Sequence, residues 1–141
     1  MKILICGLPG SGKTTLAKPF ADLISGVHIN ADKIREHYND WDFTLEGRMR
    51  QAQRMRYLSD GVVMAGKVAI ADFVCPTEAA RKEFDADFTV WMDTISRSRY
   101  EDTNDMFDPP KHCDYHVAKW FNDTHAQLTE VVATWRERNA V

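Results

Sequence analysis

Short apolar runs alternate with longer amphipathic or polar stretches along this chain. The apolar runs are rich in β-branched residues and predict buried strands at 1–6, 27–29, 68–71, 88–92 and 115–118. The stretches between them predict helices at 12–24, around 34–35, at 45–65, at 76–84 and at 124–137. Two further segments, 37–42 and 96–110, are polar, aromatic or charged, and we expect a loop at the first and a mobile segment at the second.

Capping residues support three of these helices. Thr44 is a favoured N-cap for the helix 45–65, which we expect to end at Gly66. Pro76 is expected at the opening of the helix 76–84, because proline is tolerated in a first turn. Either Asn122 or Asp123 is expected to cap the last helix.

The first predicted strand leads into a glycine-rich turn, Gly7-Leu8-Pro9-Gly10-Ser11-Gly12-Lys13-Thr14, which fits the spacing G-x-x-x-x-G-K-[ST]. In this P-loop motif, backbone N–H groups surround a phosphate chain, the lysine reaches the β- and γ-phosphates, and the hydroxyl binds Mg²⁺. A glycine-rich turn without a ligand is the alternative, and the flanking strand and helix disfavour it. We therefore expect ATP as the donor and Mg²⁺ as its companion, with these nucleotide-binding residues: Gly7, Gly10, Ser11, Gly12, Lys13, Thr14 and Thr15.

Strands that alternate with helices imply βαβ units and a parallel sheet. Together with the motif, the alternation predicts an α/β P-loop kinase fold of three layers, with a central, mostly parallel sheet of about five strands. The length of 141 residues fits a single domain, 1–141, with 96–110 as a candidate lid. In such sheets, ligands bind at the carboxyl ends of the strands.

Composition narrows the class of protein. The formal net charge of −3 argues against a protein held on nucleic acid by bulk electrostatics. No apolar run approaches the ~20 residues of a membrane span, and we expect no signal peptide, because the N-terminal residues read as the start of a strand. The cysteines Cys6, Cys75 and Cys113 are few and lack metal-ligand spacing, which favours a reducing, cytoplasmic setting.

Two carboxylates follow predicted strands, at the edge where the phosphates would lie. Asp72 ends the third strand and is placed to hold Mg²⁺ opposite Thr14; its alternative role is a helix cap ahead of Pro76. Asp32 follows the second strand and is placed to accept the acceptor's proton or to hold a metal-bound water. Its alternative role is the N-cap of the helix that starts near Lys33.

Arginines and aromatic residues supply candidate contacts for an anionic acceptor. Arg35 lies on the same helical face as Asp32, and the helix 45–65 is rich in arginine, which binds phosphate or sulfate through two hydrogen bonds. Arg97 and Arg99 of the candidate lid are expected either to act as catalytic arginines over the nucleotide or to lie on the surface. Trp41, Phe43 and Phe73 are expected either to stack on a base or to pack in the core, and Trp91 is expected in the core.

The chain resembles the adenylylsulfate (APS) kinase family through roughly its first 80 residues. That family joins a P-loop to a D-G-D-x-x-R element, a G-F-S-x-E-D-R-x-x-N-x-x-R helix start and an F-I-S-P loop. The corresponding stretches here are Asn30-Ala31-Asp32-Lys33-Ile34-Arg35, the run from Asp42 to Arg54, and Phe73-Val74-Cys75-Pro76. Three positions depart from the family pattern: Asn30 replaces an aspartate, Cys75 replaces a serine, and Asp72 stands where a small residue is usual.

The resemblance implies roles for matching residues of the acceptor site. It implies that Asp32 is the catalytic or metal-positioning acid, and that Arg35 and Arg48 bind the phosphosulfate of the acceptor. Phe43 would stack on the acceptor's adenine, Gln51 would contact the acceptor, and Val74 would supply a backbone contact beside Phe73. The implied acceptor residues are Asp32, Arg35, Phe43, Arg48, Gln51, Phe73 and Val74.

The leading hypothesis is an ATP-dependent small-molecule kinase that moves the γ-phosphoryl group to the 3′-hydroxyl of adenylyl sulfate. In it, Lys13, Asp32 and a lid arginine, Arg97 or Arg99, act in catalysis. A second hypothesis is a kinase for a nucleoside, a nucleotide or a nucleic-acid 5′-hydroxyl, although nucleic acid is the less favoured partner. A third is a nucleotide-binding switch without turnover.

Overall fold

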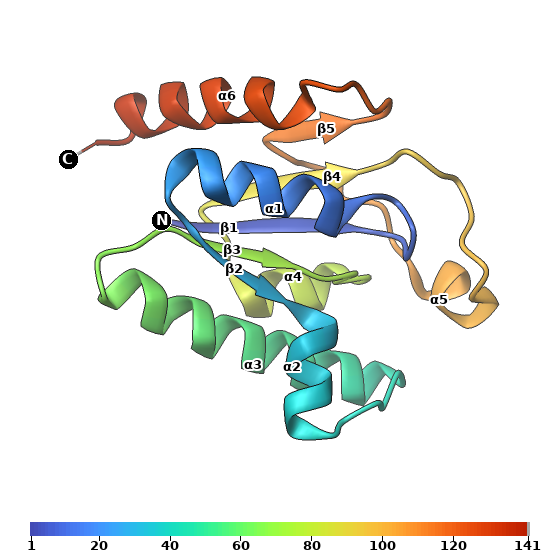
Figure 1. Ribbon diagram of the computed structural model, residues 1–141. Helices are drawn as coiled ribbons and strands as arrows, with labels where there is room; N and C mark the ends of the chain where they lie inside the picture. Colours follow the sequence, from blue (N-terminus) through green and yellow to red (C-terminus); the bar gives the residue numbers. More distant parts are fainter. Residues whose placement is uncertain (141) are drawn as a thin grey trace.

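The computed structural model describes residues 1–140 and contains a five-stranded sheet with helices on both faces (Figure 1). Its strands are β1 (Lys2–Gly7), β2 (Val27–Asn30), β3 (Ala69–Asp72), β4 (Phe88–Met92) and β5 (Tyr115–Val117). They lie in the order β2-β3-β1-β4-β5, and every neighbouring pair is parallel. The predicted α/β fold of three layers is therefore confirmed, and each predicted strand is present.

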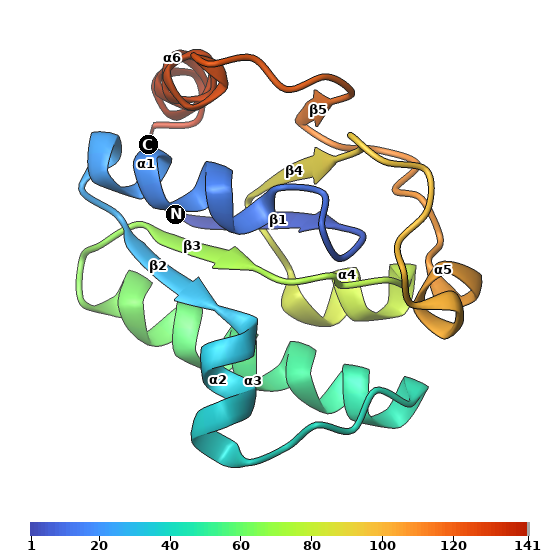
Figure 2. The ribbon, with the colours of Figure 1, turned by 45° about the vertical axis from the view of Figure 1, so that its right-hand side comes forward.

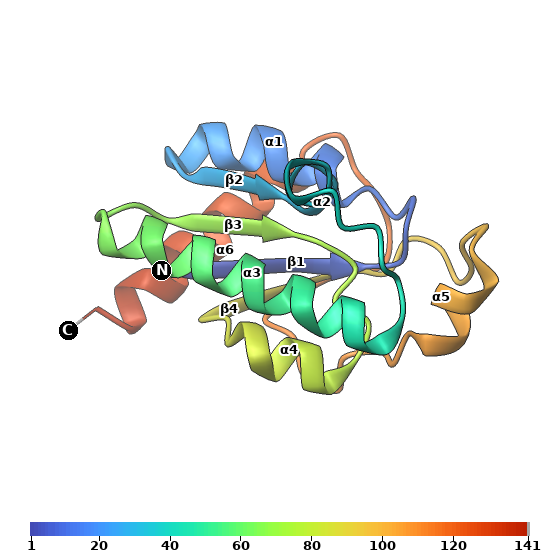
Figure 3. The ribbon, with the colours of Figure 1, turned by 90° about the horizontal axis from the view of Figure 1, so that it is seen from below.

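The helices are α1 (Lys13–Ile24), α2 (Ala31–Tyr38), α3 (Leu45–Met64), α4 (Glu78–Phe84), α5 (Glu101–Met106) and α6 (Thr124–Arg138). Helices α1 and α6 pack together over one face of the sheet, and α3 and α4 cover the other face (Figures 1 and 3). No helix within residues 1–140 combines the length and the apolarity needed to cross a bilayer.

Side chains of the central strand β1 alternate between two hydrophobic cores, as the two-residue period of a strand requires. Ile3 and Ile5 pack with α1 and α6 on one face, whereas Leu4 and Cys6 pack with α3 and α4 on the other. All four side chains are fully buried. A central parallel strand with helices on both faces is apolar throughout, and the first apolar run of the sequence shows this pattern.

Capping side chains fix where the helices begin. Thr44 caps α3 as predicted, because its Oγ1 accepts the N–H of Gly47 at 3.1 Å. Helix α4 begins at Glu78, two residues later than predicted, because the hydroxyl of Thr77 accepts the N–H of Ala80. Asp123 occupies the N-cap position of α6 but makes no capping hydrogen bond, so the predicted side-chain cap there is wrong.

Two segments predicted as irregular contain helix. Helix α2 continues through Tyr38 and ends where Asn39 takes a left-handed conformation, with φ of 49°. The 96–110 segment contains α5, and the turn ahead of this helix is joined to it by hydrogen bonds that Ser98 and Asn104 exchange through backbone and side chains. Side-chain bonds to nearby backbone order this segment, and such bonds leave no apolar period in the sequence.

The carboxyl ends of the parallel strands all face the same side of the molecule, and α5 lies beyond them (Figure 2). The chain leaves β1 toward α1 on one face and leaves the neighbouring β3 toward α4 on the other. A crevice opens where adjacent strands lead to opposite faces, and ligands of α/β proteins bind at this position.

We expect Phe20→Ala to lower the free energy of unfolding by about 3–5 kcal/mol, because it leaves a cavity where a fully buried ring packs between α1 and the sheet. Leu23→Ala on the same helix is the matched control, since Leu23 is 53% exposed, and its cost should stay under about 1 kcal/mol. Urea denaturation measures both. Equal losses would contradict the assignment of the α1 core face.

Candidate active site

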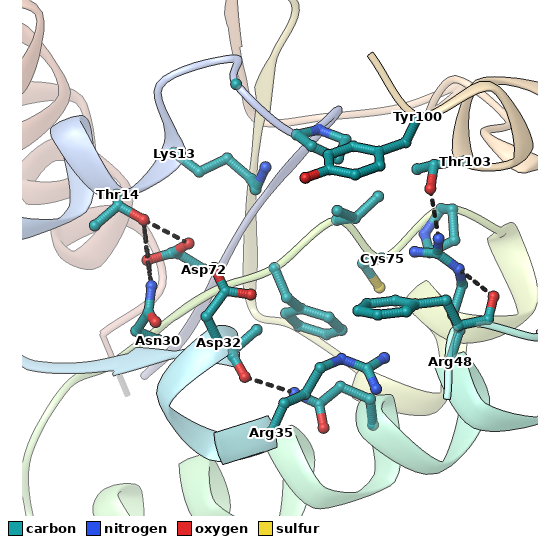
Figure 4. A pocket seen from close by; sticks show the side chains of 18 of the residues that line it. Lys13, Thr14, Asn30, Asp32, Arg35, Arg48, Asp72, Cys75, Tyr100 and Thr103 are labelled. Atoms are coloured by element: carbon teal, nitrogen blue, oxygen red, sulfur yellow. Dashed lines mark hydrogen bonds between the residues drawn. The ribbon is translucent and has the colours of Figure 1, made fainter. Parts of the chain in front are cut away.

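A cavity of about 830 Å³ opens at the carboxyl ends of the strands (Figure 4). The turn between β1 and α1 forms one wall, and the first residues of α2 and α3 form another. The loop after β3 and the helix α5 complete the lining. This volume lies within the range of sites that enclose a small organic ligand.

The turn between β1 and α1 has the backbone that a phosphate-binding loop requires. Gly10 and Gly12 have φ angles of 84° and 95°, in the region that favours glycine. At Gly7 a Cβ atom would stand 2.5 Å from the carbonyl oxygen of Met92 on the neighbouring strand β4. Glycine at these positions therefore lets the turn wrap tightly and approach β4 closely.

Lys13 extends from this turn toward the centre of the cavity (Figure 4). Its Nζ donates to the carbonyl oxygen of Leu8 at 2.9 Å. Burial lowers the pKa of Lys13, and the nearby carboxylate of Asp72 opposes that shift. The buried hydroxyl of Ser11, in the same turn, has no hydrogen-bond partner among residues 1–140. Both groups are suited to receive a polyanion, which supplies many acceptor oxygens.

Four side chains from three elements meet beside the lysine, and three of them, Thr14, Asn30 and Asp72, are labelled in Figure 4. Asp72 at the end of β3 is buried, and both of its oxygens lie 3.3 Å from Oγ1 of Thr14 at the start of α1. Asn30, the register partner of Asp72 on β2, donates to both Thr14 and Asp72 at 3.2 Å. His28 contacts the same carboxylate through Nε2. The parallel register of β2 and β3 brings these groups together.

The position of Asp72 rules out its alternative role as a helix cap and leaves its carboxylate, beside the Thr14 hydroxyl, free to bind a metal. Asp72 does not cap α4, because Thr77 does, so the cap alternative is wrong. A carboxylate beside a hydroxyl matches the oxygen ligands that Mg²⁺ prefers, and Mg²⁺ usually binds through one or two carboxylates, water and substrate phosphates. No group of three or more His, Cys, Asp or Glu side chains within the described residues would hold a metal alone.

Asp32 stands in the first turn of α2, facing the cavity (Figure 4). Its predicted alternative as the N-cap of this helix is wrong, because the side chain of Asn30 accepts the N–H of Lys33 at 3.1 Å. The Asp32 carboxylate is exposed to the cavity, on the same lining as Lys13. It is thus placed where a positioned base would meet a hydroxyl near the terminal phosphate.

Arg35 and Arg48 are both buried, on the opposite side of the cavity from Thr14 and Asp72. Arg35 donates from Nη1 to the carbonyl oxygens of Asp40 and Asp42, at 2.9 and 3.1 Å. Its guanidinium carbon lies 4.4 Å from the ring centroid of Phe43, and that of Arg48 lies 5.4 Å from it. The aromatic ring thus packs against two cations.

The positive charges of these two arginines have no direct counter-ion in the described part of the chain. Arg48 donates to the carbonyl oxygen of Phe43 at 3.0 Å and to Oγ1 of Thr103 at 2.6 Å. Neither guanidinium has a carboxylate oxygen of residues 1–140 within 4.0 Å. Burial lowers the pKa of Arg48, and Asp102 only partly opposes the shift. Because a buried cation with neutral partners is costly, this wall favours an anionic ligand.

The other arginines of α3 are neutralised within the protein. Asp40 binds Arg50 at 2.8 Å and Arg54 at 2.7 Å, and these arginines hold the pKa of Asp40 well below its usual range. Gln51 lines the cavity, but its amide is engaged at both ends, donating to the carbonyl oxygen of Ala31 and accepting from Arg54. Gln51 therefore joins the start of α2 to α3.

The loop after β3 closes the floor between the two walls. Phe73, Val74 and Cys75 all line the cavity. Cys75 has a left-handed φ of 45°, unusual for a residue other than glycine, and its carbonyl oxygen accepts from Arg81 at 3.0 Å. Burial raises the pKa of the Cys75 thiol well above its usual value, so the thiol stays protonated and is a poor nucleophile.

The structure brings most of the predicted site residues to one cavity. All seven predicted acceptor residues line it, as do the predicted metal pair and the catalytic candidates Lys13, Asp32 and Arg99. Arg97 does not line it, and its guanidinium pairs with Glu101 on the surface. A catalytic role for Arg97 would require the 96–110 segment to move. Trp91, predicted in the core, is only partly buried and stacks on His116.

Sequence reasoning missed the contribution of three residues. Tyr100 and Thr103 line the cavity from the 96–110 segment, where the sequence shows no periodicity that would reveal their placement. Asn30 caps α2 and contacts Asp72. The preference of asparagine for N-cap positions could have indicated the first of its roles, whereas the second depends on strand register.

Comparison with known proteins agrees with this geometry. The family model described as adenylylsulphate kinase matches residues 1–107. A probable adenylyl-sulfate kinase of Aeropyrum pernix is 32% identical over 88 aligned residues, and the match covers 56% of this chain and 46% of that protein. The chain thus spans about half the length of this curated relative.

Solved structures share the fold at lower identity. The APS kinase of Mycobacterium tuberculosis in complex with AMPPNP and APS superposes with a TM-score of 0.75 at 15% identity, covering 94% of this chain and 96% of that one. Shikimate kinase from Aquifex aeolicus gives 0.63 at 16% identity, covering 99% and 98%. The fold is therefore that of P-loop kinases, and, because the family model covers most of its length, this chain belongs to the adenylylsulphate kinase family.

Proposed function

We propose that this chain is an ATP-dependent kinase that transfers the γ-phosphoryl group of ATP to the 3′-hydroxyl of adenylyl sulfate, in sulfate assimilation. The observation that carries the proposal is the pair of buried arginines, Arg35 and Arg48, which face the P-loop across one cavity without a carboxylate partner. An acceptor that joins an adenine to a phosphosulfate offers both an anion for this wall and a ring for Phe43. Family membership supports the same acceptor.

The proposed division of labour follows the cavity walls. The turn from Gly7 to Thr15 holds the phosphates of ATP, and Lys13 neutralises charge on the β- and γ-phosphates. Thr14 and Asp72 would hold Mg²⁺, which would supply positive charge to offset the charge that develops on the transferred phosphoryl group. Arg35, Arg48 and Phe43 hold the acceptor, with Gln51, Phe73 and Val74 shaping its site.

In the proposed reaction, the 3′-oxygen of the acceptor attacks the γ-phosphorus in line with the bridging oxygen of ADP. The bond from phosphorus to that bridging oxygen breaks as the new bond forms, and the hydroxyl proton passes to the carboxylate of Asp32. Arg99 and Tyr100 lie at the cavity lining on the 96–110 segment, which we propose as a lid that excludes water.

The three free cysteines fit a cytoplasmic setting.

An acceptor panel tests the function. We expect ADP to form from ATP with adenylyl sulfate, and not with shikimate, gluconate, nucleosides or an oligonucleotide 5′-hydroxyl, in a coupled ADP-release assay. Lys13→Ala serves as the blank, and it should lower turnover at least about 100-fold, because it removes the cation at the transferred phosphate. Turnover with the oligonucleotide but not with adenylyl sulfate would replace this proposal by a polynucleotide kinase. ATP binding without transfer to any acceptor would favour a switch.

We expect Asp32→Asn to lower kcat by about 10²- to 10⁴-fold while the affinity for ATP changes little, because the amide keeps the shape of the carboxylate but cannot accept a proton. Steady-state kinetics and calorimetric titration with AMPPNP separate the two effects. Glu36→Gln on the same helix is the control, since Glu36 is exposed and does not line the cavity. A kcat within a few-fold of wild type would exclude Asp32 as the base.

Asp72→Asn should raise the Mg²⁺ concentration needed for half-maximal AMPPNP binding by about tenfold or more, because it removes the carboxylate beside Thr14. Titrating Mg²⁺ at fixed AMPPNP in a calorimeter measures this without turnover. Asp85→Asn is the control, because Asp85 ends α4 in a left-handed conformation that asparagine tolerates. An unchanged Mg²⁺ requirement in Asp72→Asn would contradict the metal role.

A further inference from the structure

Helix α5 contributes one buried hydroxyl to the arginine wall of the cavity. Thr103 is 4% exposed, and its Oγ1 accepts a hydrogen bond of 2.6 Å from Nη2 of Arg48 (Figure 4). These two residues are 55 positions apart in the sequence and both line the cavity. The contact therefore joins the 96–110 segment directly to a group that faces the acceptor.

Two bonds fix the orientation of the Arg48 guanidinium. Its Nε donates to the carbonyl oxygen of Phe43 and its Nη2 donates to Thr103, whereas its Nη1 has no hydrogen-bond partner among residues 1–140. Because a guanidinium is a rigid planar fork, two fixed donors determine where the remaining N–H groups point. Loss of the Thr103 bond would leave the plane held at one point only.

The chemistry of a threonine suits this position. A carboxylate in its place would neutralise Arg48 and compete with an anionic ligand, and a methyl group would leave a buried N–H donor without a partner. A hydroxyl satisfies the donor and leaves the positive charge available. The partner on Arg48 is thus a neutral acceptor, as a site for an anion requires.

We propose that Thr103 is a positioning residue for the acceptor, which acts by orienting Arg48. The inference rests on the proposed function, because it assigns Arg48 to the anion of adenylyl sulfate. Hydrogen bonds within the 96–110 segment, and one from its C-terminal end to the loop after β3, hold the part of the chain that carries Thr103. Ser98, ahead of α5, donates to Oδ1 of Asn104 inside the helix, and the N–H of Asp108 donates to the carbonyl oxygen of Pro76 at 2.7 Å. These bonds hold Thr103 in place against Arg48.

The test is a comparison of Thr103→Val with Thr103→Ser. Valine keeps the shape of threonine without the hydroxyl, so the KM for adenylyl sulfate should rise about tenfold while the KM for ATP stays within about twofold. Serine keeps the hydroxyl and should remain close to wild type for both substrates. Thr134→Val, on the exposed side of α6, controls for the general effect of this substitution.

A double-mutant cycle with Arg48→Ala tests whether Thr103 acts through the arginine. If it does, Thr103→Val should add almost nothing to the loss already caused by Arg48→Ala. Melting temperatures show whether the variants fold, and if the valine variant does not, Thr103→Ala and Thr103→Ser form the comparison in its place.

The outcomes separate this inference from the function on which it rests. A wild-type protein that transfers no phosphoryl group to adenylyl sulfate overturns both. A wild-type protein that does so, with KM values for ATP and adenylyl sulfate that rise equally in Thr103→Val, overturns the positioning role and leaves the function standing. Full additivity with Arg48→Ala overturns it as well.

Discussion

Two guanidinium groups buried without a carboxylate partner impose the main constraint on this site. Arg35 and Arg48 donate only to neutral acceptors, which are backbone carbonyl oxygens and one hydroxyl. By contrast, two other arginines of α3, Arg50 and Arg54, both pair with the carboxylate of Asp40. Within α2 and α3, the guanidinium groups without a carboxylate partner therefore lie at the cavity wall, where an anionic acceptor would offset the cost of burying them.

At the opposite end of the cavity, a buried carboxylate lies where the arginine wall has only cations. Strand register places Asp72 against Asn30 and beside Thr14, so a single buried carboxylate faces the phosphate-binding turn. Asp32 lies on the cavity lining between this cluster and the arginines (Figure 4). A transferred phosphoryl group would thus meet cations on both sides and one base, which is the arrangement that phosphoryl transfer needs.

The sequence was sufficient for the parts of this arrangement that follow local rules. The P-loop spacing, the strand and helix periods, and the cap at Thr44 each depend on neighbouring residues, and the structure agrees with them. Contacts between segments that are distant in the sequence could not be predicted from these local rules. Asn30 meets Asp72 only because β2 and β3 pair in one register, and Thr103 meets Arg48 across 55 residues. The order of the 96–110 segment depends on side-chain bonds that create no periodic pattern.

The most direct test of the account is a calorimetric comparison of adenylyl sulfate with adenosine, each titrated into the protein saturated with AMPPNP. The unpaired arginine wall predicts that adenylyl sulfate binds at least about tenfold more tightly than adenosine, because only the former carries the anion that the wall lacks. It also predicts that Arg48→Ala removes most of this difference. Equal affinities for the two ligands in the wild-type protein would contradict the central claim.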